Sequence, residues 1–203
     1  MAALSTPSAI GFPVAWPARR QELRCAIAAL ALVVLSAPPA WTQDVTEPSL
    51  KAAFVYNFAK FTEWPPEALP AASPFMACVL GDDPLGAALT RTVEGRLLSG
   101  RTIGVSHPKI DGPLRTCHLL YISNVSSEQL AAILAAVRGA PVLTISDADH
   151  FARLGGIAHI FVENGKMRFE LNLDLARRCR LLLSSRLLAL AALVIDGPSG
   201  EVR

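Results

Sequence analysis

Short apolar runs alternate with polar segments rich in glycine and proline through the middle of the chain. Four of these runs have the length and composition of strands: 75–80, 101–106, 117–123 and 142–146. Residues 84–93 and 126–138 follow two of them with helical spacing, and Ser126 with Gln129 forms a capping-box pattern. This alternation predicts a mainly parallel sheet with helices packed against it.

An amphipathic helix is predicted ahead of the first strand, over residues 50–64. Its apolar face would carry Leu50, Phe54, Phe58 and Phe61. Ser49 is a possible cap, and Pro65 would end the helix. We expect this face to dock on the core. Because Asn57 and Lys60 interrupt it, contact with a partner remains an alternative.

The last third of the chain predicts a hairpin followed by one long helix. Residues 157–162 and 166–171 are strand-like and are separated by Glu163-Asn164-Gly165, which is a strong hairpin signal. Leucines at helical spacing then run through residues 174–195. The predicted fold class is therefore α/β, a single-domain three-layer sandwich whose mainly parallel sheet has an antiparallel hairpin at its edge.

The N-terminal segment has the pattern of a secretory signal peptide. Residues 25–37 are mostly apolar and follow three arginines, and small residues and prolines come next. We expect residues 1–42 to be removed, residues 43–196 to form the domain and residues 197–203 to be a tail. A short membrane anchor is the alternative, although no run reaches the ~18–20 apolar residues of a membrane span.

Charge counts change once the predicted presequence is set aside. Residues 1–42 carry three of the 19 Lys and Arg residues and one of the 17 Asp and Glu residues, so 16 of each sign remain. A neutral domain gives no electrostatic argument for binding nucleic acid or for inserting into an anionic membrane.

Three cysteines remain after residue 42. In an oxidising compartment one disulfide and one free thiol are expected. Cys78 and Cys117 lie in strand-like runs and can pair if those strands are neighbours, whereas Cys179 lies in the predicted long helix and would pack as a small apolar residue. Closing a loop of this size would stabilise the fold by roughly 4 kcal/mol. Two buried free thiols are the alternative.

No constellation of residues indicates catalysis. The chain lacks a nucleophile elbow, a P-loop and a dinucleotide fingerprint. Asp82 and Asp83 after the first strand could hold Mg²⁺, but helix capping is the favoured interpretation. His118 is badly placed to activate Cys117, because adjacent strand residues point to opposite faces. We expect no catalytic residue, no metal site and no cofactor.

The remaining polar features are a cluster of arginines and three scattered histidines. Arg177, Arg178 and Arg180 fall in the first turns of the predicted long helix, where positive charges are unfavourable and Asp174 offsets part of the cost. We interpret them as solvated arginines with local ion pairs, and an acidic partner or an anionic ligand is the alternative. Surface or packing roles are expected of the histidines at 107, 150 and 159.

Seven segments, in order and at ordinary spacing, resemble the YfiR-like family. They are 51–65 (KAAFVYNFAKFTEWP), 78–86 (CVLGDDPLG), 117–123 (CHLLYIS), 143–147 (LTISD), 155–157 (GGI), 168–173 (RFELNL) and 184–188 (SSRLL). Each block alone is weak, but the ordered set covers roughly residues 49–195.

The resemblance implies a non-enzymatic periplasmic regulator. Such proteins bind the periplasmic part of a membrane-bound diguanylate cyclase and hold it inactive, which lowers cyclic di-GMP and biofilm formation. It also implies a homodimer that is sensitive to disulfide state, with this cyclase or another membrane sensor as its partner. A periplasmic small-ligand binding protein serving a sensor or an uptake system is the alternative, and a pocket with convergent polar groups would favour it.

The resemblance also assigns the cysteines. Cys78 and Cys117 match the disulfide common in the family. A second pair, found in some members, falls here on Ala152 and His159, so that bond and redox control through it are not expected.

A contact surface for the partner is implied as well. By position it includes Ala158, Glu170 and Ala176, next to Arg177 and Arg180 of the arginine cluster.

Overall fold

The computed structural model describes residues 46–81 and 84–197. The predicted presequence 1–42, the acidic pair Asp82 and Asp83, and most of the predicted tail lie outside these residues. The strands are β1 (Thr62–Glu63), β2 (Phe75–Leu80), β3 (Leu97–Leu98), β4 (Arg101–Ser106), β5 (Leu119–Ile122), β6 (Leu143–Ser146), β7 (Ala158–Glu163), β8 (Lys166–Asn172), β9 (Leu182–Leu183) and β10 (Leu193–Ile195). The helices are α2 (Glu47–Lys60), α3 (Leu85–Val93), α4 (Ser127–Ala136), α5 (Leu173–Arg178) and α6 (Ser185–Leu190), with a 3₁₀-helix η1 (Leu114–Thr116).

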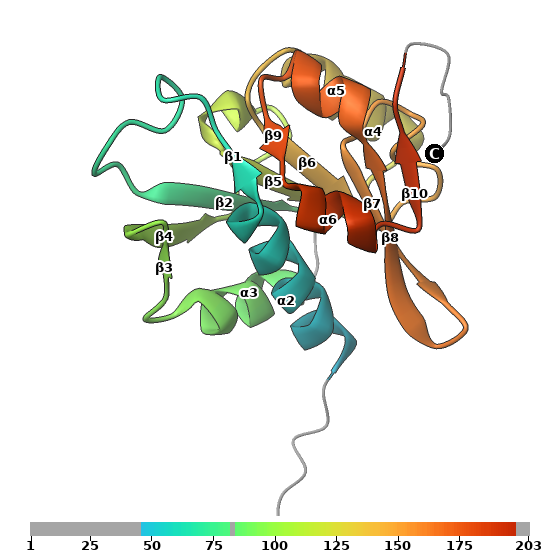
Figure 1. Cartoon of the computed structure of the whole chain (residues 1–203), viewed down its shortest axis with the longest axis horizontal. Coiled ribbons are helices and arrows are strands. Elements are labelled where there is room, and N and C mark those ends of the chain that lie inside the picture. Colours follow the sequence, from blue (N-terminus) through green and yellow to red (C-terminus); the bar gives the residue numbers. More distant parts are fainter. Residues whose placement is uncertain (1–45, 82–83, 198–203) are drawn as a thin grey trace, which may run out of the picture. The chain divides into compact units, whose positions relative to one another are not determined.

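An eight-stranded, mostly parallel sheet organises the fold, in the order β10-β8-β7-β6-β5-β2-β4-β3 (Figure 1). The run β4-β2-β5-β6-β7 is parallel throughout, and β7 and β8 form the antiparallel hairpin. The predicted fold class is confirmed. Beyond the hairpin, β10 adds in parallel to β8, so the hairpin is next to the outermost strand at this edge.

Side chains that alternate along the central strands form two cores. Ala77, Val79, Leu119 and Tyr121 pack on one face with α2, α3 and α6. The intervening residues pack on the opposite face, where α4 covers them: Cys78, Leu80, Leu120 and Ile122. Four-residue strands buried on both faces are typical of a parallel sheet between helical layers, and they explain the continuous apolar runs in the sequence.

Helix α2 lies one turn earlier than predicted. It begins after Thr46 and ends at Lys60, because Thr62 and Glu63 leave the helix to pair with β9. Its buried face is also rotated from the expected one. Ala52, Val55, Phe58 and Ala59 are buried, whereas Leu50 is 38% exposed, and Asn57 and Lys60 face solvent.

The predicted single helix over 174–195 is wrong. The segment forms α5, β9, α6 and β10 in turn. Arg180 has a left-handed backbone with φ 59°, which ends α5, and Leu182 and Leu183 then pair with β1. Ser184 caps α6 by accepting a hydrogen bond from Leu187 N–H. The leucine spacing fits a helix, but pairing with distant strands determines the structure here.

Two local predictions are confirmed. Asn164 and Gly165 take φ of 51° and 70°, as a tight hairpin turn between β7 and β8 requires. Ser126 caps α4, since Gln129 N–H donates to Ser126 Oγ at 3.2 Å and Ser126 N–H donates to Gln129 Oε1 at 2.9 Å. Among the described residues, no helix combines the length and the apolar character that crossing a bilayer would need.

Candidate functional site

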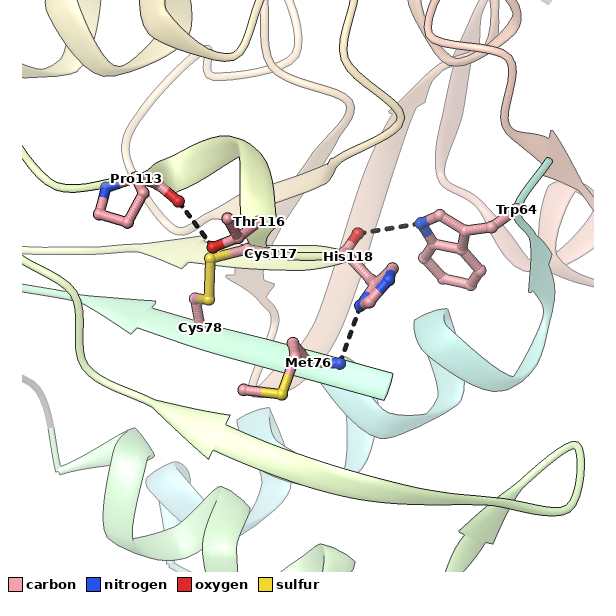
Figure 2. The surroundings of a disulfide bond; sticks show 7 residues. All are labelled: Trp64, Met76, Cys78, Pro113, Thr116, Cys117 and His118. Atoms are coloured by element: carbon pink, nitrogen blue, oxygen red, sulfur yellow. Dashed lines mark hydrogen bonds between the residues drawn. A yellow bond between two sulfur atoms is a disulfide. The ribbon is translucent and has the colours of Figure 1, made fainter. Parts of the chain in front are cut away.

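A disulfide ties the two central strands β2 and β5 together (Figure 2). Cys78 lies in β2, and Cys117 follows η1 two residues before β5, with 5.9 Å between the two Cα atoms. These are the two cysteines that the sequence predicted to pair. Both are buried on the α4 side of the sheet. The third cysteine, Cys179, is buried and free, and burial raises the pKa of its thiol, as suits a packing role.

The imidazole of His118 connects three segments beside this disulfide (Figure 2). Its Nδ1 accepts a hydrogen bond from Met76 N–H at 2.9 Å, and its Nε2 lies 3.0 Å from Ala68 O. The ring is therefore neutral, with the proton on Nε2 donated to Ala68. Burial lowers the pKa of His118, and the nearby positive charge of Arg101 lowers it further.

Aromatic side chains surround this histidine. His118 stacks on Phe75 with 5.3 Å between ring centroids, and Trp64 meets Phe75 edge to face at 4.9 Å. The indole Nε1–H of Trp64 donates to His118 O at 3.1 Å. His118 thus holds the end of β1 and the start of β2 together, a role that sequence reasoning missed.

Loop 65–74, between β1 and β2, depends on polar anchors. Every residue in it is at least partly exposed, and Leu69 packs against the main core. Apart from His118, Arg101 of β4 donates to Pro70 O at 2.8 Å and to Leu69 O at 3.3 Å. Near the start of the loop, Glu67 forms an ion pair with Arg180, which follows α5. The loop therefore bridges the disulfide region and the C-terminal segment.

The predicted partner-contact residues fall into two groups. Ala158 and Ala176 are fully buried, so neither side chain reaches the surface in this conformation. Glu170 is partly exposed, and its Oε2 lies 3.5 Å from Nδ1 of His159. Arg177 and Arg180 are exposed.

We use the term arginine surface for Arg177, Arg178, Arg180 and Leu182. Each arginine has an acidic partner: Arg177 pairs with Asp196, Arg178 with Asp174, and Arg180 with Glu67. Ion pairs are present as interpreted, although only that of Arg178 lies within one helix. The expected position was wrong, because Arg177 and Arg178 lie in the last turn of α5, where positive charges are favourable. Leu182 follows Arg180 by two residues and is 63% exposed. Exposed apolar and arginine side chains are both common where one protein surface meets another.

The other histidines belong to no metal-binding cluster of the described residues. His107 and His150 are exposed, whereas His159 is buried and stacks on Phe161 with 5.2 Å between centroids. Within residues 46–81 and 84–197, no group of three or more His, Cys, Asp or Glu residues could hold a metal ion. Cys117 is in the disulfide and so is no free nucleophile. The acidic pair at 82–83, the one metal candidate of the sequence, lies outside the described residues.

Cavities in the described part are open or small. A groove of about 460 Å³ runs between α3 and the β3–β4 hairpin, and its polar residues are exposed: Thr90, Glu94, Arg96 and Thr102. A second, of about 240 Å³, opens beside Trp64, Leu69 and Arg101 under loop 65–74. A third, of about 130 Å³, lies between α4 and α5. None of these has the buried, convergent polar groups typical of a small-ligand site.

Comparison with known families gives a match over most of the described residues. A family model described as YfiR/HmsC-like matches residues 48–192. No curated protein matches the chain. The matched range extends from α2 to the residue before β10 and includes the disulfide, His118 and the arginine surface.

Proposed function

The chain belongs to the YfiR/HmsC-like family, and we propose that it binds the periplasmic part of a membrane-bound diguanylate cyclase and holds that enzyme inactive. Membership implies a periplasmic regulator of a diguanylate cyclase, which is a regulatory and not an enzymatic role. The match across residues 48–192 carries the proposal. The disulfide between Cys78 and Cys117, which suits an oxidising compartment, supports it.

The mechanism we propose is a population shift. A regulator that binds the inactive conformation of the cyclase more tightly than the active one moves the equilibrium toward the inactive state. A shift from 1:99 to 99:1 needs an affinity difference of about 10⁴-fold between the two conformations. The consequence would be less cyclic di-GMP and less biofilm.

We place the contact on the arginine surface together with Glu170. The three arginines are already paired with acids of the same chain, and an acidic surface on the cyclase could take over those pairs while Leu182 becomes covered. Exchange of one carboxylate for another costs little desolvation, so such a surface gives orientation and specificity more than affinity. The buried residues Ala158 and Ala176 would affect this surface indirectly, by setting how β7 and α5 pack.

Two further expectations belong to this proposal. We infer that residues 1–42 direct export and are removed, which would place residues 43–196 in the periplasm. We also propose that the regulator acts as a homodimer. Sedimentation of the exported protein and sequencing of its N-terminus test these two points directly.

Binding to the purified periplasmic part of the cyclase tests the proposal. We expect calorimetry to show a complex with the chain from residue 43, and Arg177→Glu with Arg180→Glu to weaken it at least ~10-fold by reversing two charges. Arg91→Glu is the matched control, because Arg91 is exposed on α3 away from this surface. Absence of binding by the unaltered chain would overturn the proposal, and equal loss in the control would overturn the surface assignment.

A further inference from the structure

One of the anchors of loop 65–74 is a histidine that can hold it only while the ring is neutral. His118 uses one ring nitrogen as an acceptor, from Met76 N–H, and the other as a donor, to Ala68 O. A second proton would sit on Nδ1 and face the N–H of Met76, whose nitrogen is 2.9 Å away. Two donors cannot share that space, so the ring or the strand must move.

The charges around the ring make this conflict stronger. Arg101, on β4, brings a positive charge near the imidazole while its guanidinium holds Leu69 O and Pro70 O of the same loop. Glu67, the acidic residue of the loop, is paired with Arg180. The contacts of the ring with β2, at Met76 N–H and at the Phe75 side chain, are with uncharged residues.

The loop has room to move when its anchor fails. Its residues are all partly or fully exposed, and the cavity of about 240 Å³ beneath it adjoins Trp64 and Leu69. Since Ala68 directly follows Glu67, displacement of the Ala68 carbonyl also displaces the carboxylate that pairs with Arg180.

We propose that protonation of His118 releases loop 65–74 and separates Glu67 from Arg180, so that acid remodels the arginine surface. The regulatory meaning of this change rests on the proposed function, because the freed Arg180 belongs to the surface assigned to the cyclase. The direction is fixed by the geometry: neutral pH keeps the loop docked, and acid opens it.

Amide hydrogen exchange of loop 65–74 tests the inference, using the chain from residue 43, which contains the whole compact unit Val45–Arg203. We expect protection of the loop, corrected for intrinsic rates, to fall between pH 7.5 and pH 5.0. The fall approaches about tenfold for each unit of pKa difference between docked and released states once the pH is below both pKa values. Trp64, the single tryptophan of residues 43–203, gives a second readout, since its emission reports on the contact with His118.

Two variants separate the mechanism from general acid effects. His118→Asn offers Met76 N–H an acceptor oxygen but cannot titrate, so its loop exchange should be the same at both pH values. His107→Asn is the matched control, because His107 is exposed, and it should keep the full response. Unchanged protection in the unaltered chain, or a response that persists in His118→Asn, would overturn the inference.

The test remains decisive if His118→Asn does not fold. The proton resonances of the His118 ring and the Trp64 emission of the unaltered chain must then share one midpoint, and two separate midpoints would overturn the inference. None of these measurements needs the cyclase. A loop that does not respond, in a chain that binds the cyclase, refutes the inference alone, whereas a responding loop without cyclase binding refutes the proposed function alone.

Discussion

The β2–β5 pair and the C-terminal segment from α5 to β10 are held together in different ways. β2 and β5 are joined by a parallel ladder, by the disulfide and by the side chain of His118, and their residues are buried on both faces of the sheet. The C-terminal segment consists of two six-residue helices and two short strands. It joins the rest of the molecule through the short pairings of β9 with β1 and β10 with β8, through buried residues such as Leu181 and Leu187, and through the exposed ion pair of Arg180 with Glu67.

The β2–β5 pair therefore contributes mainly to the stability of the fold, whereas the exposed pairs of the C-terminal segment can change partners. Residues buried on both faces of the sheet pack in one arrangement, and substituting them lowers the free energy of unfolding. Exposed ion pairs are worth little individually and can be exchanged for those of a partner. Loop 65–74 has contacts of both kinds, because Ala68 is bound by His118 of the first region and Glu67 pairs with Arg180 of the second.

The largest effect is expected from removing the disulfide. Cys78→Ala with Cys117→Ala should lower the free energy of unfolding by about 4 kcal/mol, because the unfolded chain gains the freedom of a 39-residue separation. Urea denaturation followed by circular dichroism measures this. Cys179→Ala is the control and should cost nearer ~1 kcal/mol, as buried point substitutions commonly do. Equal costs for the two changes would remove the contrast between the regions.

A matched pair of leucine truncations sharpens the same comparison. Leu119 in β5 is fully buried, so Leu119→Ala should cost about 3 kcal/mol through lost burial and a residual cavity. Leu182 in β9 is 63% exposed, so Leu182→Ala should cost less than about 0.5 kcal/mol. Denaturant midpoints of the two variants provide the test. Similar losses would contradict the exposure of Leu182 and the contrast between the two positions.

A smaller effect is expected from acid. Burial and Arg101 lower the pKa of His118 in the folded state below its usual value of 6.5, so the unfolded chain binds the proton more readily. The stability contributed by neutral His118 is therefore complete above pH 6.5 and is lost as the pH falls below it. Urea titrations at pH 7.5 and pH 5.5 should show this loss, and His118→Asn should lack that part of it. An equal pH dependence in both proteins would contradict the assignment.

The smallest effect is expected from the arginine surface. Arg178 and Asp174 form an exposed pair one helical turn apart, with 2.7 Å between nitrogen and oxygen. Their coupling, measured by a double-mutant cycle with alanine at both positions, should be about 0.3–0.5 kcal/mol. A coupling above ~1.5 kcal/mol would mean that this pair organises α5, and the surface would then be less free to exchange partners.

The elements that could be predicted from the sequence are those that depend on residues close together in the chain. The strand at 101–106, the cap at Ser126 and the turn at Asn164-Gly165 each depend on residues within one short segment, and all three are present. The segment from 174 to 195 failed because its leucines satisfy helical spacing while its structure depends on pairing with β1 and β8. Pairing between distant strands does not change the spacing of apolar residues within a segment.

In the candidate site, too, some features could be predicted from short segments and others depend on the whole fold. The two cysteines could be paired from the sequence because both lie at strand-like runs. The contacts of His118 could not, since they require β2, β5 and loop 65–74 to be in place first. The same holds for Glu67 and Arg180, because an opposite charge can be matched to many partners until the fold selects one.

The pairing of β1 with β9 has a consequence for how the protein is assembled. Thr62 and Leu183 are partners, so strand β1 appears early in synthesis while its partner appears near the end. The disulfide joins residues that emerge much closer together. The central strands can therefore close first, while β1 waits unpaired, and docking of the last segment becomes the late step that a truncated or stalled chain never reaches.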